Sequence, residues 1–341
     1  MEALAGICEG GVKTHCAYDD IISYQNLLIA WREFLSGKKK RRDVAEFSLR
    51  FADNLSLLYG DLVARTYRHG KYYPFKINDP KPRDIHKATV RDRLVHHAIY
   101  RTLYPYFDSK FIFDSYSCRI GKGTHRAINR FRDFGRIVSK NNTRTCWILK
   151  CDIRKFFASI NHGILKSTLA NHTSDVHIFA LLAEIIDSFH TDGKPGVGLP
   201  LGNLTSQLLV NIYMNEFDHY VKRVLKAKYY IRYADDFVVL AEDKTSLESF
   251  IPIMAEFLRS RLGLEFHPKK VSIKTLATGI DFLGWVNFPH HRVLRTTTKN
   301  RMFRNLEKEI DSIKYSAVNA SYLGLLKHGN TYRLRRQTSL Y

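Results

Sequence analysis

The sequence has few of the features that mark a secreted or zinc-stabilised protein. Its 341 residues include only five cysteines, at positions 8, 16, 118, 146 and 151, and no two have the spacing of a zinc-binding pair. An odd number of scattered cysteines argues against a disulfide framework, so we expect reduced thiols in a cytoplasmic protein. The first residues, MEALAGICEGGVKTH, lack the basic start and long apolar stretch of a signal peptide.

Long apolar runs and acidic residues are also scarce. No apolar run approaches the roughly 20 residues that cross a bilayer, so we expect no membrane association. Asp and Glu number 33 against 54 Lys and Arg, a formal net charge of +21. Repulsion between like charges opposes folding, so an excess of this size suits a protein that follows a phosphate backbone. A hydrophobic fraction of 45% is typical of a folded globular protein.

Apolar periodicity predicts an α+β protein. Residues 20–70 are expected to be helical and to include one helix over 44–65, and a further helix over 91–104 is expected to end at Pro105. Short strands are expected before Asp152 and on either side of residues 234–236. The other predicted elements are helices from about 162, over 204–225 and over 247–261, a loop over 192–202, and a basic helical tail from Thr298.

Three aspartates stand at the ends of predicted strands. Asp152 ends one strand, and Asp235 and Asp236 lie in the tight connection of a hairpin. If these strands are neighbours, the carboxylates converge at one edge of a sheet, where such oxygen ligands bind Mg²⁺. Two ions about 3.5–4 Å apart can activate a 3′-hydroxyl and stabilise a pyrophosphate leaving group. Taken alone, however, two adjacent aspartates are more often a simple turn signal.

The surrounding sequence favours the catalytic interpretation. Residues 233–236, YADD, match the YxDD signature of reverse transcriptases, and the chain resembles that family in seven blocks that follow the family order. The blocks are KPRDIHKATVRDRLVHHAI (81–99), SYSCRIGKGTHRAI (115–128), LKCDIRKFFASI (149–160), GLPLGNLTSQ (198–207), YADDF (233–237), GLEFHPKK (263–270) and GIDFLGW (279–285).

This resemblance implies a right-hand polymerase fold. It divides the chain into an N-terminal helical extension (1–70), fingers (71–145), a palm with a small antiparallel sheet and finger-side helices (146–290), and a short helical thumb (291–341). The implied activity is RNA-directed DNA polymerisation with two Mg²⁺ ions, for which Mn²⁺ is able to substitute. The implied partners are a template RNA, a primer or cDNA strand, and dNTPs.

The resemblance also assigns roles to matching positions. Asp152, Asp235 and Asp236 are the expected catalytic acids and, with Ile153, the expected metal ligands. Lys270 (or Lys269) is the expected general acid, with a solvated surface lysine as the alternative. The expected dNTP-binding set is Lys81, Arg83, Phe157, Leu201, Gly202 and Gln207, in which the Phe157 ring excludes a 2′-hydroxyl unless it is only a core residue. The expected primer-grip set is Phe282, Leu283, Gly284 and Trp285, although Trp285 is also a candidate core residue.

One block resembles a narrower group. Most of the family carries Gln before the glycine of the LPxG block and Pro after its serine, whereas this chain has Leu201 and Ser206-Gln207. These substitutions, with GKGTHRA (121–127) and SYLGLLKHGNTYRL (321–334), are similar to reverse transcriptases of diversity-generating retroelements. Members of that group copy a template-repeat RNA, misincorporate mainly opposite adenine, and work with a small basic helical accessory protein. Leucine offers contact without hydrogen-bond direction, which suggests a link to infidelity.

Other functions stay open. A retron enzyme is expected to carry an NAxxH signature, which is not found, and a group II intron maturase is expected to extend beyond the roughly fifty residues that follow Pro289. An antiphage defence enzyme can share this core, whether encoded by a bacterium, an archaeon or a phage. A catalytically inactive RNA-binding scaffold is expected to lose at least one of the three aspartates, and all are present.

Overall fold

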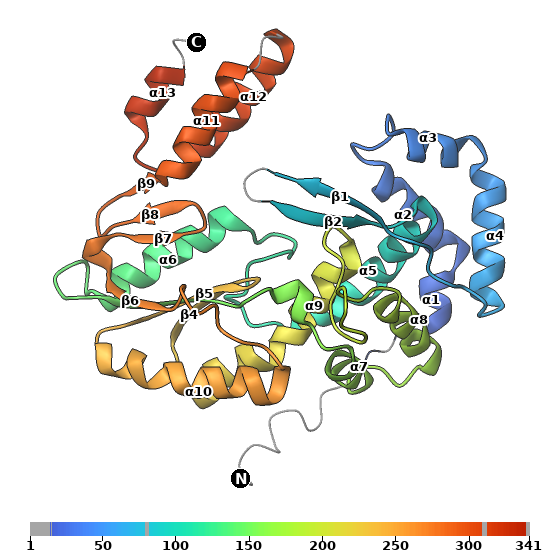
Figure 1. Cartoon of the computed structure of the whole chain (residues 1–341), viewed down its shortest axis with the longest axis horizontal. Helices are drawn as coiled ribbons and strands as arrows, with labels where there is room; N and C mark the ends of the chain where they lie inside the picture. Colours follow the sequence, from blue (N-terminus) through green and yellow to red (C-terminus); the bar gives the residue numbers. More distant parts are fainter. Residues whose placement is uncertain (1–13, 15, 79–81, 309–311, 339–341) are drawn as a thin grey trace.

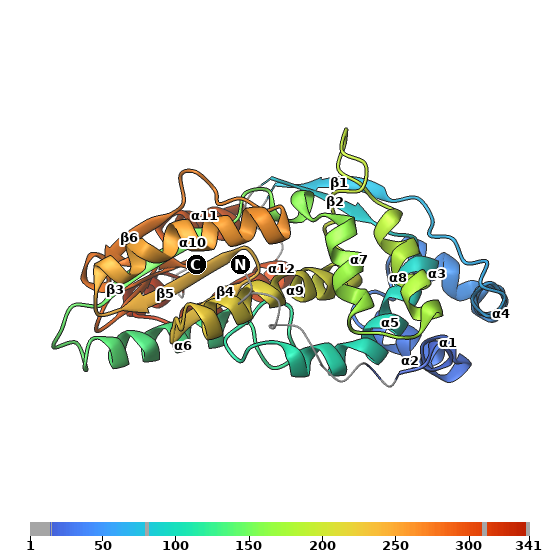
Figure 2. The ribbon, with the colours of Figure 1, turned by 90° about the horizontal axis from the view of Figure 1, so that it is seen from below.

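The computed structural model describes residues 14, 16–78, 82–308 and 312–338. Four helices come first: α1 (Tyr18–Ile22), α2 (Tyr24–Leu35), α3 (Arg42–Leu49) and α4 (Phe51–Val63). An antiparallel hairpin follows, formed by β1 (Tyr73–Ile77) and β2 (Arg83–Lys87), and then α5 (Val90–Lys110) and α6 (Thr124–Val138). The molecule is elongated, with α3 and α4 at one end and a central sheet toward the other (Figure 2).

The central sheet has four antiparallel strands in the order β4-β5-β3-β6. They are β3 (Trp147–Asp152), β4 (Tyr229–Tyr233), β5 (Asp236–Ala241) and β6 (Ser272–Thr275). Between β3 and β4 lie a short 3₁₀ turn (Phe156–Ser159), α7 (His162–Ala170), α8 (Val176–Asp187), α9 (Leu204–His219) and a π-helical turn (Tyr220–Val224). Helix α10 (Lys244–Leu262) connects β5 to the segment before β6.

Alternating side chains of the sheet divide the core into two. In β3, Leu149 points into a core shared with α9 and α10, whereas Ile148 points into a second core shared with α6. Figure 1 shows α10 on one side of the sheet and α6 on the other. Among the described residues, helices therefore cover both faces of this sheet, while the ends of its strands are not part of either core.

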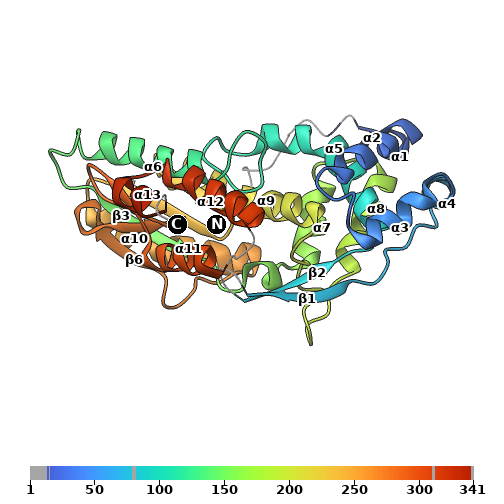
Figure 3. The ribbon, with the colours of Figure 1, turned by 90° about the horizontal axis from the view of Figure 1, so that it is seen from above.

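A second, three-stranded sheet supports the C-terminal helices. It consists of β7 (Ile280–Phe282), β8 (Trp285–Asn287) and β9 (Arg292–Leu294) and is followed by α11 (Thr296–Lys308), α12 (Ser312–Leu326) and α13 (Tyr332–Thr338). Figure 3 shows α11 and α12 above the central sheet. The Phe282 ring lies 5.6 Å from Phe131 of α6 (centroid to centroid), so this sheet shares the second core.

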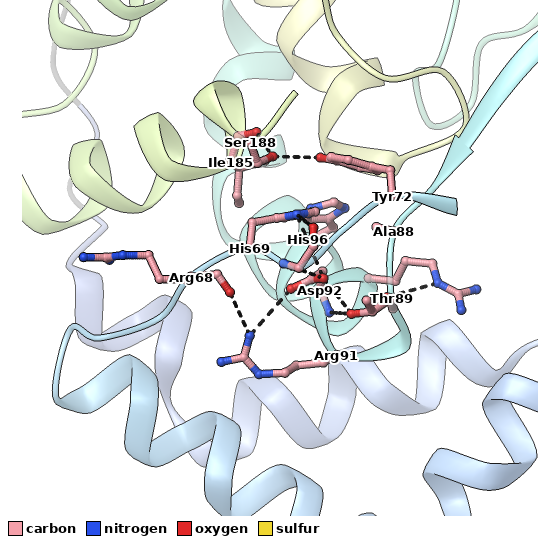
Figure 4. Close-up of polar contacts among 12 residues, drawn as sticks. Arg68, His69, Tyr72, Ala88, Thr89, Arg91, Asp92, His96, Ile185 and Ser188 are labelled. Carbon is pink, nitrogen blue, oxygen red and sulfur yellow. Dashed lines mark hydrogen bonds and ion pairs between the residues drawn. The ribbon is translucent and has the colours of Figure 1, made fainter. Parts of the chain in front are cut away.

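A buried polar cluster joins the N-terminal helices to the base of the β1–β2 hairpin (Figure 4). Asp92 of α5 accepts hydrogen bonds from the Tyr67 hydroxyl at 2.8 Å, the Thr89 hydroxyl at 2.6 Å and the Gly70 amide at 3.1 Å. The His69 and His96 rings meet through their Nε2 atoms at 3.2 Å. Burial, and then neighbouring His69, hold the pKa of His96 well below its usual range, so this ring is neutral.

The described helices differ from the sequence prediction in two places. The helix expected over 44–65 is divided at Arg50, whose φ and ψ are −119° and 40°. Phe47 and Phe51, which lie on either side of this bend, are 5.2 and 4.9 Å from the Trp31 ring (centroid distances), so both α3 and α4 pack against α2. The prediction that Pro105 ends a helix is wrong, because α5 continues to Lys110. Burial of Tyr104 and Phe107 compensates for the one backbone hydrogen bond that proline removes.

Other expectations are confirmed. The strand ending at Asp152, the hairpin around residues 234–236, and the helices from 162 and over 247–261 all appear with small shifts of boundary. Cys16, Cys118, Cys146 and Cys151 are free thiols, and Cys8 lies outside the described residues. Within the described ranges, no helix is long and apolar enough to cross a membrane.

Candidate active site

Three aspartates meet at one end of the central sheet. Strands β3 and β5 pair so that Asp152 lies opposite Asp236, and the Ile153 amide donates to the Asp235 carbonyl at 3.1 Å. Asp152 is 7% exposed, while Asp235 and Asp236 are half-buried. The strand order thus brings together the acids that the sequence places 83 and 84 residues apart.

A buried arginine stabilises the hairpin turn that carries Asp235 and Asp236. Ala234 has φ of 55°, a left-handed conformation that is unfavourable for a residue with a side chain. The buried Arg232 guanidinium donates to the Ala234 carbonyl at 3.2 Å, and its other donors bind the buried Asp218 carboxylate. We did not predict this pair from the sequence; an arginine within an otherwise apolar strand, YYIRY, is the only signal for it.

The proximity of the acids affects their ionisation. Burial raises the pKa of Asp235 to about 6, and the Asp236 and Asp152 carboxylates add to this rise. Lys270 acts in the opposite direction and lowers the pKa of Asp235. The site therefore carries more negative charge than its protein surroundings neutralise, and a further cation would relieve it.

Lys270 is the cation nearest to the acids. Its Nζ lies 2.8 Å from Asp152 Oδ2, and the His267 amide donates to the Asp152 carbonyl at 2.7 Å. The neighbouring Lys269 donates its amide to His267 Nδ1 at 3.2 Å. Among the described residues, no three His, Cys, Asp or Glu side chains are grouped closely enough to form a ready-made metal site.

The loop before α9 is attached to the β1–β2 hairpin. The His86 amide donates to the Leu201 carbonyl at 3.0 Å, and the Asn203 side chain donates to the His86 carbonyl at 2.8 Å. A Cβ at Gly202, where φ is 101°, would lie 2.7 Å from the Ile85 side chain, so only glycine permits this approach. Sequence reasoning missed Ile85, His86 and Asn203, because their contacts join segments more than 100 residues apart.

Of the remaining residues of the expected dNTP set, Phe157 and Gln207 lie on segments that adjoin this loop. Arg83 is exposed on β2, and Lys81 lies outside the described residues. Phe157 is half-buried beside the fully buried Phe156, and its carbonyl accepts from the Leu199 amide at 2.8 Å. Phe157 also packs against the core that α9 and α10 share, and its contact with the sugar stays a prediction. Gln207 is half-buried on α9.

The expected primer-grip residues fall into two kinds. Phe282 and Trp285 are 0% and 1% exposed and belong to the second core. Leu283 and Gly284 form the turn between β7 and β8, with φ of 50° and 88°. This turn is therefore more exposed than the two aromatic residues that flank it, which anchor it to the second core.

The family model described as reverse transcriptase (RNA-dependent DNA polymerase) matches residues 76–287, more than half of the chain. The chain belongs to the reverse transcriptase family. This reverse transcriptase is an RNA-directed DNA polymerase, and its mixed helix and strand architecture is that of a right-hand polymerase.

Similar proteins include relatives encoded in introns. The chain is 27% identical over 290 residues to protein YkfC of Escherichia coli K12, covering 73% of this chain and 74% of YkfC. It is 26% identical over 180 residues to the group II intron-encoded protein LtrA of Lactococcus lactis, covering 49% of this chain but 28% of LtrA. The structure of apo telomerase from Candida tropicalis matches with a TM-score of 0.52 and 12% identity, covering 74% of this chain and 51% of that one. This last likeness shows the fold alone.

Proposed function

We propose that this reverse transcriptase copies a template-repeat RNA into cDNA with frequent substitutions opposite adenine, as part of a diversity-generating retroelement. The observation that carries the proposal is Leu201, where most of the family carries Gln. Its carbonyl is held by the β2 strand, so its position relative to the fingers is fixed. Its aliphatic side chain provides contact but no directional hydrogen bond.

The chemistry in this proposal is two-metal nucleotidyl transfer. Asp152, Asp235 and Asp236, with the main chain at Ile153, would hold two Mg²⁺ ions, which when bound activate the primer 3′-hydroxyl and stabilise the leaving pyrophosphate. The excess negative charge around Asp235 supports this role, because carboxylate oxygens are the ligands that Mg²⁺ prefers. Mn²⁺ has similar ligand preferences and would substitute.

Other residues would position the substrates. Arg83 (with Lys81) would bind the triphosphate, since a guanidinium can contact two phosphate oxygens. Phe157 would pack against the sugar, and Gly202 and Gln207 would line the base-pair side. Lys270 would give a proton to the leaving pyrophosphate from its place beside Asp152. The turn Leu283–Gly284, fixed by Phe282 and Trp285, would support the primer end.

We propose the domain division 1–70 (N-terminal extension), 71–145 (fingers), 146–290 (palm) and 291–341 (thumb). Helix α6 falls within the residue range proposed for the fingers, but it packs against the palm sheet. In space, α6 therefore belongs with the palm. A small, basic, helical accessory protein is the proposed partner, alongside template RNA, cDNA and dNTPs.

The decisive experiment is to sequence cDNA made by the purified protein with Mg²⁺, dNTPs and a primed RNA that contains all four bases. We expect substitutions to gather opposite template adenine, and no product from an Asp235→Ala/Asp236→Ala control. Leu201→Gln should reduce the adenine errors at least severalfold, while the matched apolar variant Leu201→Met should keep them. An unchanged error spectrum in Leu201→Gln would show that Leu201 does not cause the errors opposite adenine.

A second candidate follows from the comparisons. Several relatives are intron-encoded proteins, including LtrA, and a defence or retron-like enzyme would share the same core. Evenly low errors in the sequenced cDNA would favour this second group over diversification. Failure to make any product, even with a co-expressed accessory protein, would favour an inactive RNA-binding scaffold.

A further inference from the structure

A basic pocket lies between the palm and the last helices, away from the three aspartates. Its volume is about 260 Å³, and it is lined by α6, the turn between β8 and β9, and the turn between α12 and α13. Strand β8 separates it from the turn Leu283–Gly284, because the two turns lie at opposite ends of this three-residue strand. The pocket is therefore a different place from the proposed primer grip.

The pocket carries strong positive charge. Arg132 and Arg136 stand one helical turn apart on α6, and Lys327 and Arg292 reach it from other elements. No acidic residue is found among the described residues that line it, and among these four cations Arg132 forms an ion pair, at 3.5 Å with neighbouring Asp133. Like charges one turn apart repel each other by a few tenths of a kcal/mol, so their grouping favours an anionic ligand.

Arg292 provides the most specific evidence. Its guanidinium donates through Nε to the His328 carbonyl and through Nη2 to Asn129 Oδ1, at 2.7 Å in the latter case. Its Nη1 is buried and has no hydrogen-bond partner. A buried donor without a partner is costly, and an anion bound in the pocket would stabilise this guanidinium through its charge. Burial and the nearby Arg132 guanidinium lower the pKa of Arg292, an effect that a bound anion would oppose.

Flat rings accompany the cations. Phe288 and His291 line the pocket and stack at 4.8 Å between ring centroids, with 12° between their planes. His291 is exposed and Phe288 half-exposed. Cations beside accessible rings form the arrangement that binds single-stranded nucleic acid, in which phosphates meet the charges and bases stack on the rings.

We propose that this pocket binds the phosphate backbone of a single-stranded RNA segment that lies outside the copied primer–template duplex. Arg132, Arg136 and Arg292 contact its phosphates, and the Phe288–His291 pair receives a base. The cations come from separate elements and surround an open pocket, which suits a continuous strand. A free triphosphate shares the phosphate chemistry, and the experiment below separates the two sources.

The test compares two double variants of the full chain that lose the same charge. Arg132→Gln/Arg136→Gln removes two pocket cations, and Arg259→Gln/Arg261→Gln removes two exposed arginines from α10 as the matched control. Binding is measured over a range of salt concentrations with two fluorescent probes. One is a short RNA–DNA primer–template duplex, and the other is the same duplex with a 20-nucleotide single-stranded RNA extension.

We expect the pocket variant to bind the extended probe about tenfold more weakly, with a salt slope reduced by about 1.4, roughly 0.7 for each lost phosphate contact. Its binding and extension of the short duplex should match the control variant. Equal weakening on both probes, or no weakening on either, would overturn the proposal. The proposal would also be overturned if inorganic triphosphate bound the pocket at micromolar concentration and the single-stranded extension added no affinity.

Discussion

Two carboxylate sites of the palm, the single Asp218 and the three aspartates at the sheet edge, differ in how their charge is neutralised. Asp218 is fully buried, and it accepts 2.7 Å bonds from both Nε and Nη2 of Arg232 and a 2.8 Å bond from the Tyr230 hydroxyl. At the sheet edge, three aspartates lie together, and Lys270 pairs with one of them, Asp152, at 2.8 Å. The buried charge of Asp218 is balanced by Arg232, whereas we propose that metal ions balance the acids at the sheet edge.

The pKa values express the same difference. Burial alone would lower the pKa of Arg232, but the Asp218 carboxylate outweighs it and holds this pKa above its usual value. At the edge, burial and neighbouring acids raise the pKa of Asp235 to about 6. Asp218, whose charge Arg232 balances, is expected to stabilise the fold. The sheet edge, where several carboxylates lie together, is the expected place for metal-dependent chemistry.

The largest expected effect is the loss of catalysis at the sheet edge. Asp235→Asn/Asp236→Asn keeps the shape of the turn but removes two negative charges. We expect single-nucleotide incorporation to fall by about 10³-fold or more, since the metal ions supply several kcal/mol of transition-state stabilisation. Rapid-quench primer extension measures this, and an unchanged circular dichroism spectrum serves as the control. Incorporation within tenfold of the original rate would be incompatible with the proposed site.

The second prediction concerns the structural pair. Asp218→Asn leaves the Arg232 charge buried without its partner, which is expected to cost about 3–5 kcal/mol in the free energy of unfolding. Urea denaturation measures this loss, and the sheet-edge variant above should show none. If Asp218→Asn has the same urea midpoint as the original protein, the Asp218–Arg232 pair does not stabilise the fold as proposed.

The third prediction concerns Lys270. Lys270→Met should reduce incorporation by about 10²-fold, as expected when a general acid is lost, and Lys270→Arg should restore part of it. Because Lys270 lowers the pKa of Asp235, the acidic limb of the pH–rate profile should also move to higher pH in Lys270→Met. A purely structural lysine would change the stability without moving this limb.

The smallest expected effect is on stability at different pH values. The pKa of Asp235 is higher in the folded chain, at about 6, than its ordinary value of 3.8. The folded state therefore binds the Asp235 proton more tightly than the unfolded state does. The stability that this protonation contributes is fully present below pH 3.8 and is lost as the pH rises through 6. In metal-free buffer, Asp235→Asn should become more stable than the original protein by about 1–3 kcal/mol between pH 4 and 7. Equal pH dependence of both proteins would show that Asp235 has an ordinary pKa.

Local features of the fold could be predicted from the sequence, and distant contacts could not. The strand before Asp152 and the hairpin at 234–236 depend on neighbouring residues, so pattern and turn signals located them. The bend at Arg50 was missed because Phe47 and Phe51 keep the four-residue spacing of a single helix face across it. Pro105 was misread because its local preference is outweighed by burial on both sides.

The site shows the same division. The three aspartates could be identified from their order in the sequence and from the family resemblance. The attachment of Leu201 to His86 and the Asp218–Arg232 pair could not, because each depends on side chains or strands brought together only by folding. The basic pocket combines segments around residues 131–136, 287–292 and 327–330, which carry no shared motif.

The most direct test of the comparison is thermal unfolding of three proteins as Mg²⁺ is added at pH 7.5. If the sheet-edge acids are completed by metal, the melting temperature of the original protein should rise with Mg²⁺ and that of Asp235→Asn/Asp236→Asn should stay constant. Lys270→Met leaves the acids in place, so its melting temperature should still rise. An equal rise in the original protein and the Asp235→Asn/Asp236→Asn variant would place the metal elsewhere and contradict the account.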